Sequence, residues 1–132
     1  MANASPLRPS PGSACLSLPR AIGAGDLDAA AACFARDGCL ITPDATAVHG
    51  RESIRRVLAQ MIVRRTEIEV ELSTSVAAGA VVLLHQRWRI RSGEQVEGSF
   101  EQVADATLIA RRVEGAWKLS IAAPWGYPQA YG

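Results

Sequence analysis

The sequence lacks the features that mark several large classes of protein. It has no apolar run long enough to span a bilayer, and its amino terminus lacks the basic-then-apolar order of a secretion signal. Neither sign of charge dominates, because 14 basic residues balance 13 acidic ones, so no strong field favours nucleic acid or an anionic membrane as a partner. We therefore expect a cytoplasmic protein with no nucleic-acid or membrane partner.

Motifs for metals and common cofactors are also missing. The three cysteines, Cys15, Cys33 and Cys39, have no CxxC spacing and no neighbouring histidine, so we expect reduced thiols and no metal site. The chain contains no phosphate-binding loop, dinucleotide fingerprint, serine nucleophile elbow or metal-binding histidine pair. The sequence thus predicts no cofactor.

What the chain does have is the length and composition of one globular domain. It contains 132 residues, of which 48% are hydrophobic and 20% charged, enough to bury one core. Three prolines among small and polar residues predict a disordered amino-terminal tail over residues 1–12. The domain is therefore expected to span residues 13–132.

The first part of this domain predicts two short helices and a strand. Ser17 is expected to cap a helix that ends near Ala24, because Pro19 is tolerated in a first turn. Asp26 is expected to cap a second, alanine-rich helix that Gly38 ends. A short strand should follow over residues 39–43.

A third helix is predicted from Arg51 to about Ile62. Apolar residues recur there with the spacing of one helix face, at positions 54, 57, 58 and 61. Glu52 and Arg56 lie four residues apart on the wet side of the same helix. This is the clearest helical pattern in the chain.

Beyond residue 62 the apolar residues alternate with polar ones, which is typical of strands with one face on a core. Over residues 81–91 the even positions, including Gln86 and Trp88, share the apolar face, and the odd positions carry mostly histidine and arginine. Pairing with residues 67–72 through the turn near Ala78 and Gly79 would bring three glutamates near those arginines. A third strand within residues 95–113, bent by a bulge, and a last strand near 117–121 complete a four-strand antiparallel meander.

Several short motifs in this order of elements carry a resemblance to a known family. They are the stretches 25–29 (GDLDA), Phe34 with Asp37, Pro43-Asp44, 50–54 (GRESI), Arg87-Trp88, 115–117 (GAW) and 124–126 (PWG). With these motifs the chain resembles the nuclear transport factor 2-like superfamily, and within it small bacterial SnoaL-like proteins of the SgcJ/EcaC type. The resemblance covers residues 25–126.

The resemblance implies an α+β fold of the cystatin-like type. A cone-shaped, curved antiparallel sheet would pack on two or three amino-terminal helices and enclose a pocket, and the outer sheet face would form a homodimer. It implies no single chemistry, since the superfamily includes isomerases, cyclases, hydrolases and dehydratases as well as binding and scaffolding members. The ketosteroid isomerase mechanism is not expected, because Thr42 and Leu18 occupy the matching positions of its base and its tyrosine.

Three hypotheses for function follow. In the first, a small apolar organic ligand binds inside the cone against Thr42, Gln86, Trp88 and Phe100, where a core tryptophan and a glutamine bonded to a neighbour are the structural alternative. In the second, Asp105 is buried among apolar residues and acts as acid or base, against the alternative that it faces outward or pairs with an arginine. In the third, the domain is a dimerising association module.

Overall fold

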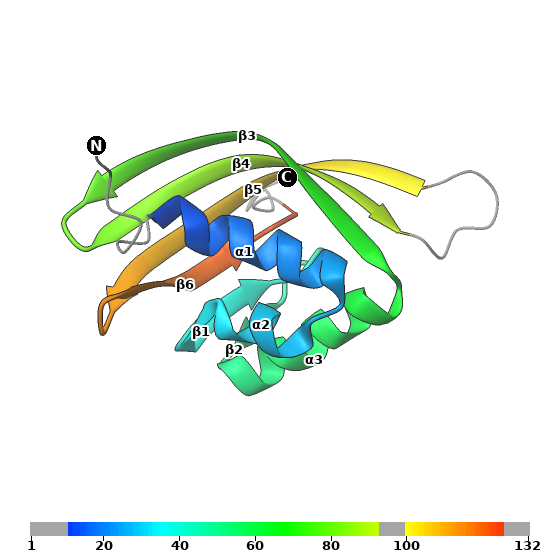
Figure 1. Ribbon diagram of the computed structural model, residues 1–132, viewed down its shortest axis with the longest axis horizontal. Coiled ribbons are helices and arrows are strands. Elements are labelled where there is room, and N and C mark those ends of the chain that lie inside the picture. Colours follow the sequence, from blue (N-terminus) through cyan, green and yellow to red (C-terminus); the bar gives the residue numbers. More distant parts are fainter. Residues whose placement is uncertain (1–10, 93–99, 126–132) are drawn as a thin grey trace, which may run out of the picture.

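In the described part of the chain, a curved six-stranded sheet carries three helices on its concave side (Figure 1). The computed structural model describes residues 11–92 and 100–125. The helices are α1 (Pro11–Ala24), α2 (Leu27–Ala32) and α3 (Arg51–Val63). The strands are β1 (Phe34–Ile41), β2 (Ala47–His49), β3 (Thr66–Ala78), β4 (Val81–Ser92), β5 (Phe100–Val113) and β6 (Ala116–Ala123). The predicted α+β class with a curved sheet on amino-terminal helices is confirmed.

The strand order is β2-β1-β6-β5-β4-β3. Strands β3 to β6 form the predicted antiparallel meander, and β2 adds a short antiparallel edge to β1. Strand β1 instead runs parallel to β6, with Phe34 opposite Leu119. The described part of the sheet is therefore mixed, and β1 connects the helical segment to the last strand of the meander.

The second helix is shorter than the sequence predicts. Asp26 caps it as expected, accepting a hydrogen bond from the amide of Ala29 at 3.1 Å, but α2 ends at Ala32 and not near Gly38. The chain turns into β1 at Phe34, whose side chain is fully buried and whose carbonyl accepts hydrogen bonds from the guanidinium of Arg51. Burial and pairing with β6 thus override the helix propensity of this stretch.

The first helix is longer than predicted, because α1 begins at Pro11 and continues through Pro19. Residues 1–10 of the expected tail lie outside the described residues, and positions 11 and 12 belong to the helix. A proline inside a helix costs a hydrogen bond to the preceding turn. Here the buried side chains of Leu18, Ala21 and Ile22 pack on the inner face of the sheet, which offsets that cost.

The third helix and the β3–β4 hairpin agree with the sequence. Ile54 and Leu58 of α3 are buried, and their neighbours Val57 and Met61 pack partly against the same core. In the hairpin Glu67 lies opposite Arg91 and Glu69 opposite Arg89, with a bulge between Val70 and Leu72. A bulge predicted in β5 is found instead on the β6 side of the β5–β6 pair, since Ile109 and Ala110 face residues 121 and 119.

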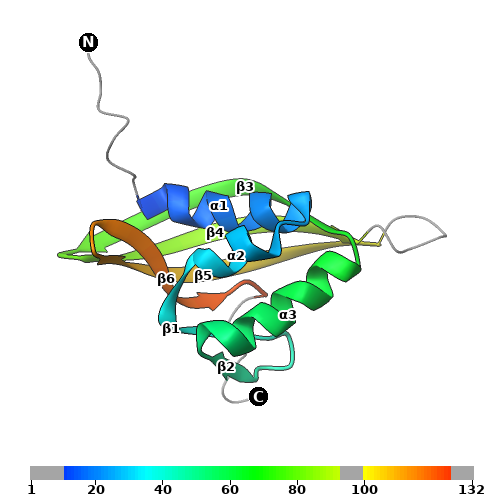
Figure 2. The same cartoon turned by 60° about the horizontal axis from the view of Figure 1, so that its bottom comes forward.

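The core lies between the helices and the even-numbered side of strands β4 and β5. Figure 2 shows α1, α2 and α3 on the same side of the long strands. Along β4 buried and exposed residues alternate, which places Leu84, Gln86 and Trp88 inside and leaves Leu83 and His85 outside. Within the described residues no helix has the length and hydropathy needed to cross a membrane.

Candidate functional site

Gln86 and Trp88 point into the interior, as the alternation predicts, but they bond to each other. The indole Nε1 of Trp88 donates to Oε1 of Gln86 at 2.7 Å, and Nε2 of Gln86 donates to Oγ of Ser73 at 3.2 Å. Trp88 is fully buried and Gln86 is 1% exposed. The structure therefore fits the alternative reading, in which the tryptophan belongs to the core and the glutamine amide is satisfied by its neighbours.

Thr42 follows β1 and belongs to a tight turn. Its hydroxyl donates to the carboxylate of Asp44 and accepts from the amide of Thr46 at 3.2 Å. The hydrogen bond from Thr42, with others from Thr46, lowers the pKa of the Asp44 carboxyl below its ordinary value. The Thr42 hydroxyl thus serves the turn, while the next residue, Pro43, borders the cavity described below.

Asp105 lies on the outer face of the sheet, opposite Arg87 in the β4–β5 register. Its side chain is 62% exposed, and its carboxylate is 3.6 Å from Nε of Arg87. The hypothesis of an acid or base inside the cone needed the opposite orientation, so the strand alternation that carries Ala104 and Ala106 inward removes its geometric basis. Phe100 begins β5 opposite Ser92, and its side chain lies outside the described part of the chain.

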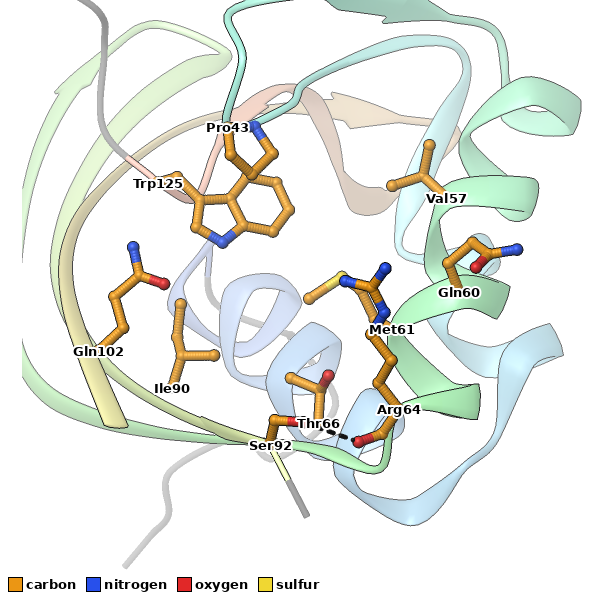
Figure 3. A pocket seen from close by; sticks show the side chains of 10 residues that line it. All are labelled: Pro43, Val57, Gln60, Met61, Arg64, Thr66, Ile90, Ser92, Gln102 and Trp125. Atoms are coloured by element: carbon orange, nitrogen blue, oxygen red, sulfur yellow. Dashed lines mark hydrogen bonds between the residues drawn. The ribbon is translucent and has the colours of Figure 1, made fainter. Parts of the chain in front are cut away.

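A cavity of about 540 Å³ opens between α3 and the ends of the long strands (Figure 3). Apolar and polar side chains contribute equally to its lining, which consists of Pro43, Val57, Gln60, Met61, Arg64, Thr66, Ile90, Ser92, Gln102 and Trp125. Thr66 and Ile90 are buried and form its floor, whereas Gln60, Arg64 and Gln102 are exposed and mark its mouth. In Figure 3 Trp125 and Pro43 border the side away from the helix.

One stripe of α3 forms a wall of this cavity. Val57, Gln60, Met61 and Arg64 follow each other at the spacing i, i+3, i+4 and i+7, which brings them to one side of a helix. The neighbouring stripe with Ile54 and Leu58 faces the core. The helix therefore packs against the core with the stripe that contains Ile54 and Leu58, and it borders the cavity with the neighbouring stripe.

Two polar side chains in the cavity have no partner inside the described part of the chain. The hydroxyl of Thr66 and the guanidinium of Arg64 make no hydrogen bond or ion pair with any described residue. By contrast, the hydroxyl of Ser92 donates to the backbone carbonyl of Arg64 at 3.1 Å, which ties the end of α3 to β4. This bond holds the main chain of Arg64 beside the sheet and leaves its side chain to the cavity.

None of the residues that line this cavity was among the candidate site residues predicted from the sequence. The helix spacing placed Val57 and Met61 on the apolar face of a predicted helix, and Trp125 belonged to the PWG motif that carried part of the family resemblance. Alternation along β4 shows which residues point inward, but it does not show which inward residues border empty space. Ile90 does so, and Trp88, two residues earlier on the same face, does not.

Outside the cavity, the described residues do not bring titratable side chains together into another candidate site. No group of three histidine, cysteine, aspartate or glutamate side chains there could hold a metal ion. Cys33 and Cys39 are both free thiols, and burial raises the pKa of Cys33 to about 11. A smaller hollow of about 370 Å³ is lined by Arg36, Gly50, Arg51 and Glu52, but the Arg51 guanidinium already bonds the Phe34 carbonyl.

Comparison with known proteins gives a family and a set of fold neighbours. The sequence model of the SnoaL-like domain matches residues 17–118. A candidate dehydratase of the nuclear transport factor 2-like family from Streptomyces avermitilis is 18% identical, with a TM-score of 0.75 over 86% of this chain and 92% of that one. No curated protein matches the sequence.

Two further solved structures have the same fold. A candidate calcium/calmodulin-dependent protein kinase type II association domain from Thiobacillus denitrificans is 23% identical, with a TM-score of 0.74 over 92% of this chain and 100% of that one. A nuclear transport factor 2-like protein with a cystatin-like fold from Novosphingobium aromaticivorans is 12% identical, with a TM-score of 0.73 over 84% and 75%. At these identities the likeness shows the fold alone.

Proposed function

The chain belongs to the SnoaL-like domain family, and on that premise we propose that it binds a small, largely apolar organic molecule in the cavity between α3 and the sheet. The observation that carries the proposal is the cavity itself. Its volume of about 540 Å³ lies in the range of small-molecule sites, and an indole, a thioether and aliphatic groups line it together with a few polar groups.

The proposal is limited to binding. Among the described residues that line the cavity there is no carboxylate, histidine or cysteine that could act as a general acid, general base or nucleophile. Arg64, Thr66 and the glutamine amides can donate hydrogen bonds that orient a ligand, but they are not the side chains that commonly act as a general acid or base. The SgcJ/EcaC subgroup and the cytoplasmic location stay predictions, and the free thiols of Cys33 and Cys39 accord with the second.

A fluorescence titration with the neutral probe N-phenyl-1-naphthylamine tests this function. Gln60 lies exposed at the mouth of the cavity, so Gln60→Trp should fill the entrance without disturbing the core. Val63, on the same helix, is 70% exposed and does not line the cavity, which makes Val63→Trp the matched control. We expect the probe to bind the wild type and Val63→Trp alike and Gln60→Trp at least about tenfold more weakly. Equal binding by all three would contradict the proposal.

We also propose that the protein forms a homodimer through the outer face of the sheet. An aliphatic row crosses four strands there, because Val76 lies opposite Leu83, Leu83 opposite Ile109 and Ile109 opposite Ile121. Val76 is 66% and Leu83 41% exposed, and none of the three described helices packs on this face. Ile109 and Ile121 are half-buried, and a row of aliphatic side chains that is exposed at one end in this way supports an association surface.

Light scattering on the purified protein tests the dimer. The wild type should have twice the 14.0 kDa mass of one chain, and Leu83→Asp should reduce it to a monomer because the charge cannot be desolvated in an apolar interface. Val63→Asp places the same charge on α3, away from the sheet, and should leave the dimer intact. A wild-type monomer at high micromolar concentration would count against this face as a dimer interface.

A further inference from the structure

We propose that the ligand of the cavity is an organic acid, whose carboxylate pairs with the guanidinium of Arg64 while its apolar body lies against Trp125, Met61 and Ile90. This inference rests on the binding function proposed above and names the chemical class of the ligand. Arg64 is the one charged residue among the described residues that line the cavity, and none of the others is acidic. An arginine that lines a cavity without an acidic partner provides a site for an anion.

The surroundings of Arg64 hold the arginine at this place. Its backbone nitrogen bonds to the carbonyl of Gln60 at 3.2 Å and closes the end of α3, and its own carbonyl accepts from Ser92 at 3.1 Å. The backbone is therefore fixed at both hydrogen-bonding groups. Only the side chain remains to move, and it can present two parallel N–H groups to a carboxylate at the mouth of the cavity.

Thr66 supplies a second polar group on the floor. The residue is only 7% exposed, yet its hydroxyl has no hydrogen-bond partner among the described residues. The hydroxyl is not sealed off in the core, and it reaches the cavity, where a ligand or water can hydrogen-bond with it. Figure 3 shows the Thr66 side chain directed into the cavity on the same side as Arg64, so one carboxylate oxygen can accept from each residue.

The charge of the site favours a monoanion over a phosphate. One guanidinium supplies one positive charge, and the adjacent helix end is the carboxyl end of α3, whose dipole disfavours a ligand with more than one negative charge. Phosphate sites commonly use the amino end of a helix or several basic groups. The opposite wall, with Trp125 and Pro43, is apolar and suits the hydrocarbon part of the ligand.

Competition for the bound N-phenyl-1-naphthylamine probe tests this class. The competitors are 2-naphthylacetic acid and 2-naphthylacetamide, which have the same skeleton and differ in charge. We expect the acid to bind the wild type about tenfold or more tightly than the amide, with the difference reduced in 0.5 M sodium chloride. Arg64→Gln should make the two affinities equal by weakening the acid alone.

Arg65→Gln is the matched control, because it removes the same charge one residue later from a side chain that does not line the cavity. It should keep the preference for the acid. Equal affinity of acid and amide for the wild type, with Gln60→Trp still weakening both, would overturn the organic-acid inference and leave the binding function standing. If neither competitor nor the probe binds the wild type, the binding function fails and this inference with it.

Discussion

Replacing Gln86 by leucine tests whether this residue serves the core or a ligand. Gln86 is the largest buried polar side chain among the described residues, and its amide both accepts from Trp88 at 2.7 Å and donates to Ser73 at 3.2 Å. Leucine has a similar volume but can do neither. The substitution therefore leaves the indole N–H of Trp88 buried without an acceptor.

The magnitude follows from the loss of these bonds. A buried polar group without a partner costs about 1–3 kcal/mol, and the burial of additional apolar surface by leucine offsets part of that cost. We expect Gln86→Leu to lower the free energy of unfolding by about 1–3 kcal/mol. For a domain of this size the melting temperature falls by roughly 4 °C per kcal/mol, so the expected loss is about 4–12 °C.

The assay is urea unfolding followed by circular dichroism, with Trp88→Phe and the double variant Gln86→Leu/Trp88→Phe alongside. Removing both polar partners leaves neither unsatisfied, so the double variant should be at least about 1 kcal/mol more stable than the sum of the single effects predicts. Additive losses would mean that Gln86 and Trp88 do not depend on each other for their hydrogen bonds. A Gln86→Leu protein of unchanged stability that no longer binds N-phenyl-1-naphthylamine would instead assign Gln86 to the ligand.

Three further predictions concern single residues. Burial raises the pKa of Cys33 from 9.0 to about 11, so the folded state favours the neutral thiol. The resulting contribution to the free energy of unfolding is complete below about pH 9 and is lost as the pH rises towards 11. Unfolding curves should therefore show the wild type losing about 2 kcal/mol more than Cys33→Ala over that range. Asp105→Asn breaks an exposed pair with Arg87, so thermal melts should change by less than about 1 kcal/mol and probe binding should be unchanged; lost binding would revive a role for Asp105. Gly38→Ala would bring a methyl group within 3.0 and 3.1 Å of two backbone carbonyl oxygens, and urea unfolding should show a loss of about 1–3 kcal/mol, whereas no loss would mean that the two strands can separate slightly there.

Local patterns predicted the elements whose partners are near in sequence. The spacing of Ile54 and Leu58 identified α3, and the alternation along 81–91 with its facing glutamates identified the β3–β4 hairpin. These elements bury one face against a continuous core, so their period of 3.6 or two residues is visible in the chain itself. The order of helices and strands inferred from these patterns, together with the family motifs, then indicated the fold.

Contacts between residues far apart in the sequence determine the element boundaries that local patterns could not predict. Phe34 ends a helical run because it pairs with Leu119, which is far away in the sequence. Pro19 is tolerated inside α1 because the sheet covers its neighbours Leu18 and Ala21. Propensity is a weak guide where such tertiary contacts contribute more free energy than the local preference.

The candidate site was harder to predict than the fold for a related reason. A cavity is the space that packing leaves open between elements, so no single segment carries its signature. The alternation of inward and outward residues along β4 correctly placed Trp88 inside. It could not show that the open space lies farther along the strand, beside Ile90. Arg64, at the end of α3, is a charged residue and so does not belong to the apolar pattern of the helix, and only its position between Ser92 and the cavity gives it a role.

A crystal structure of the protein with 2-naphthylacetic acid would show whether the cavity beside α3 is the ligand site. We expect the naphthalene ring between α3 and the sheet, in contact with Trp125 and Ile90, and the carboxylate within hydrogen-bond distance of Arg64. The naphthalene ring bound anywhere else on the protein, or a cavity that stays empty at saturating concentration, would contradict this expectation.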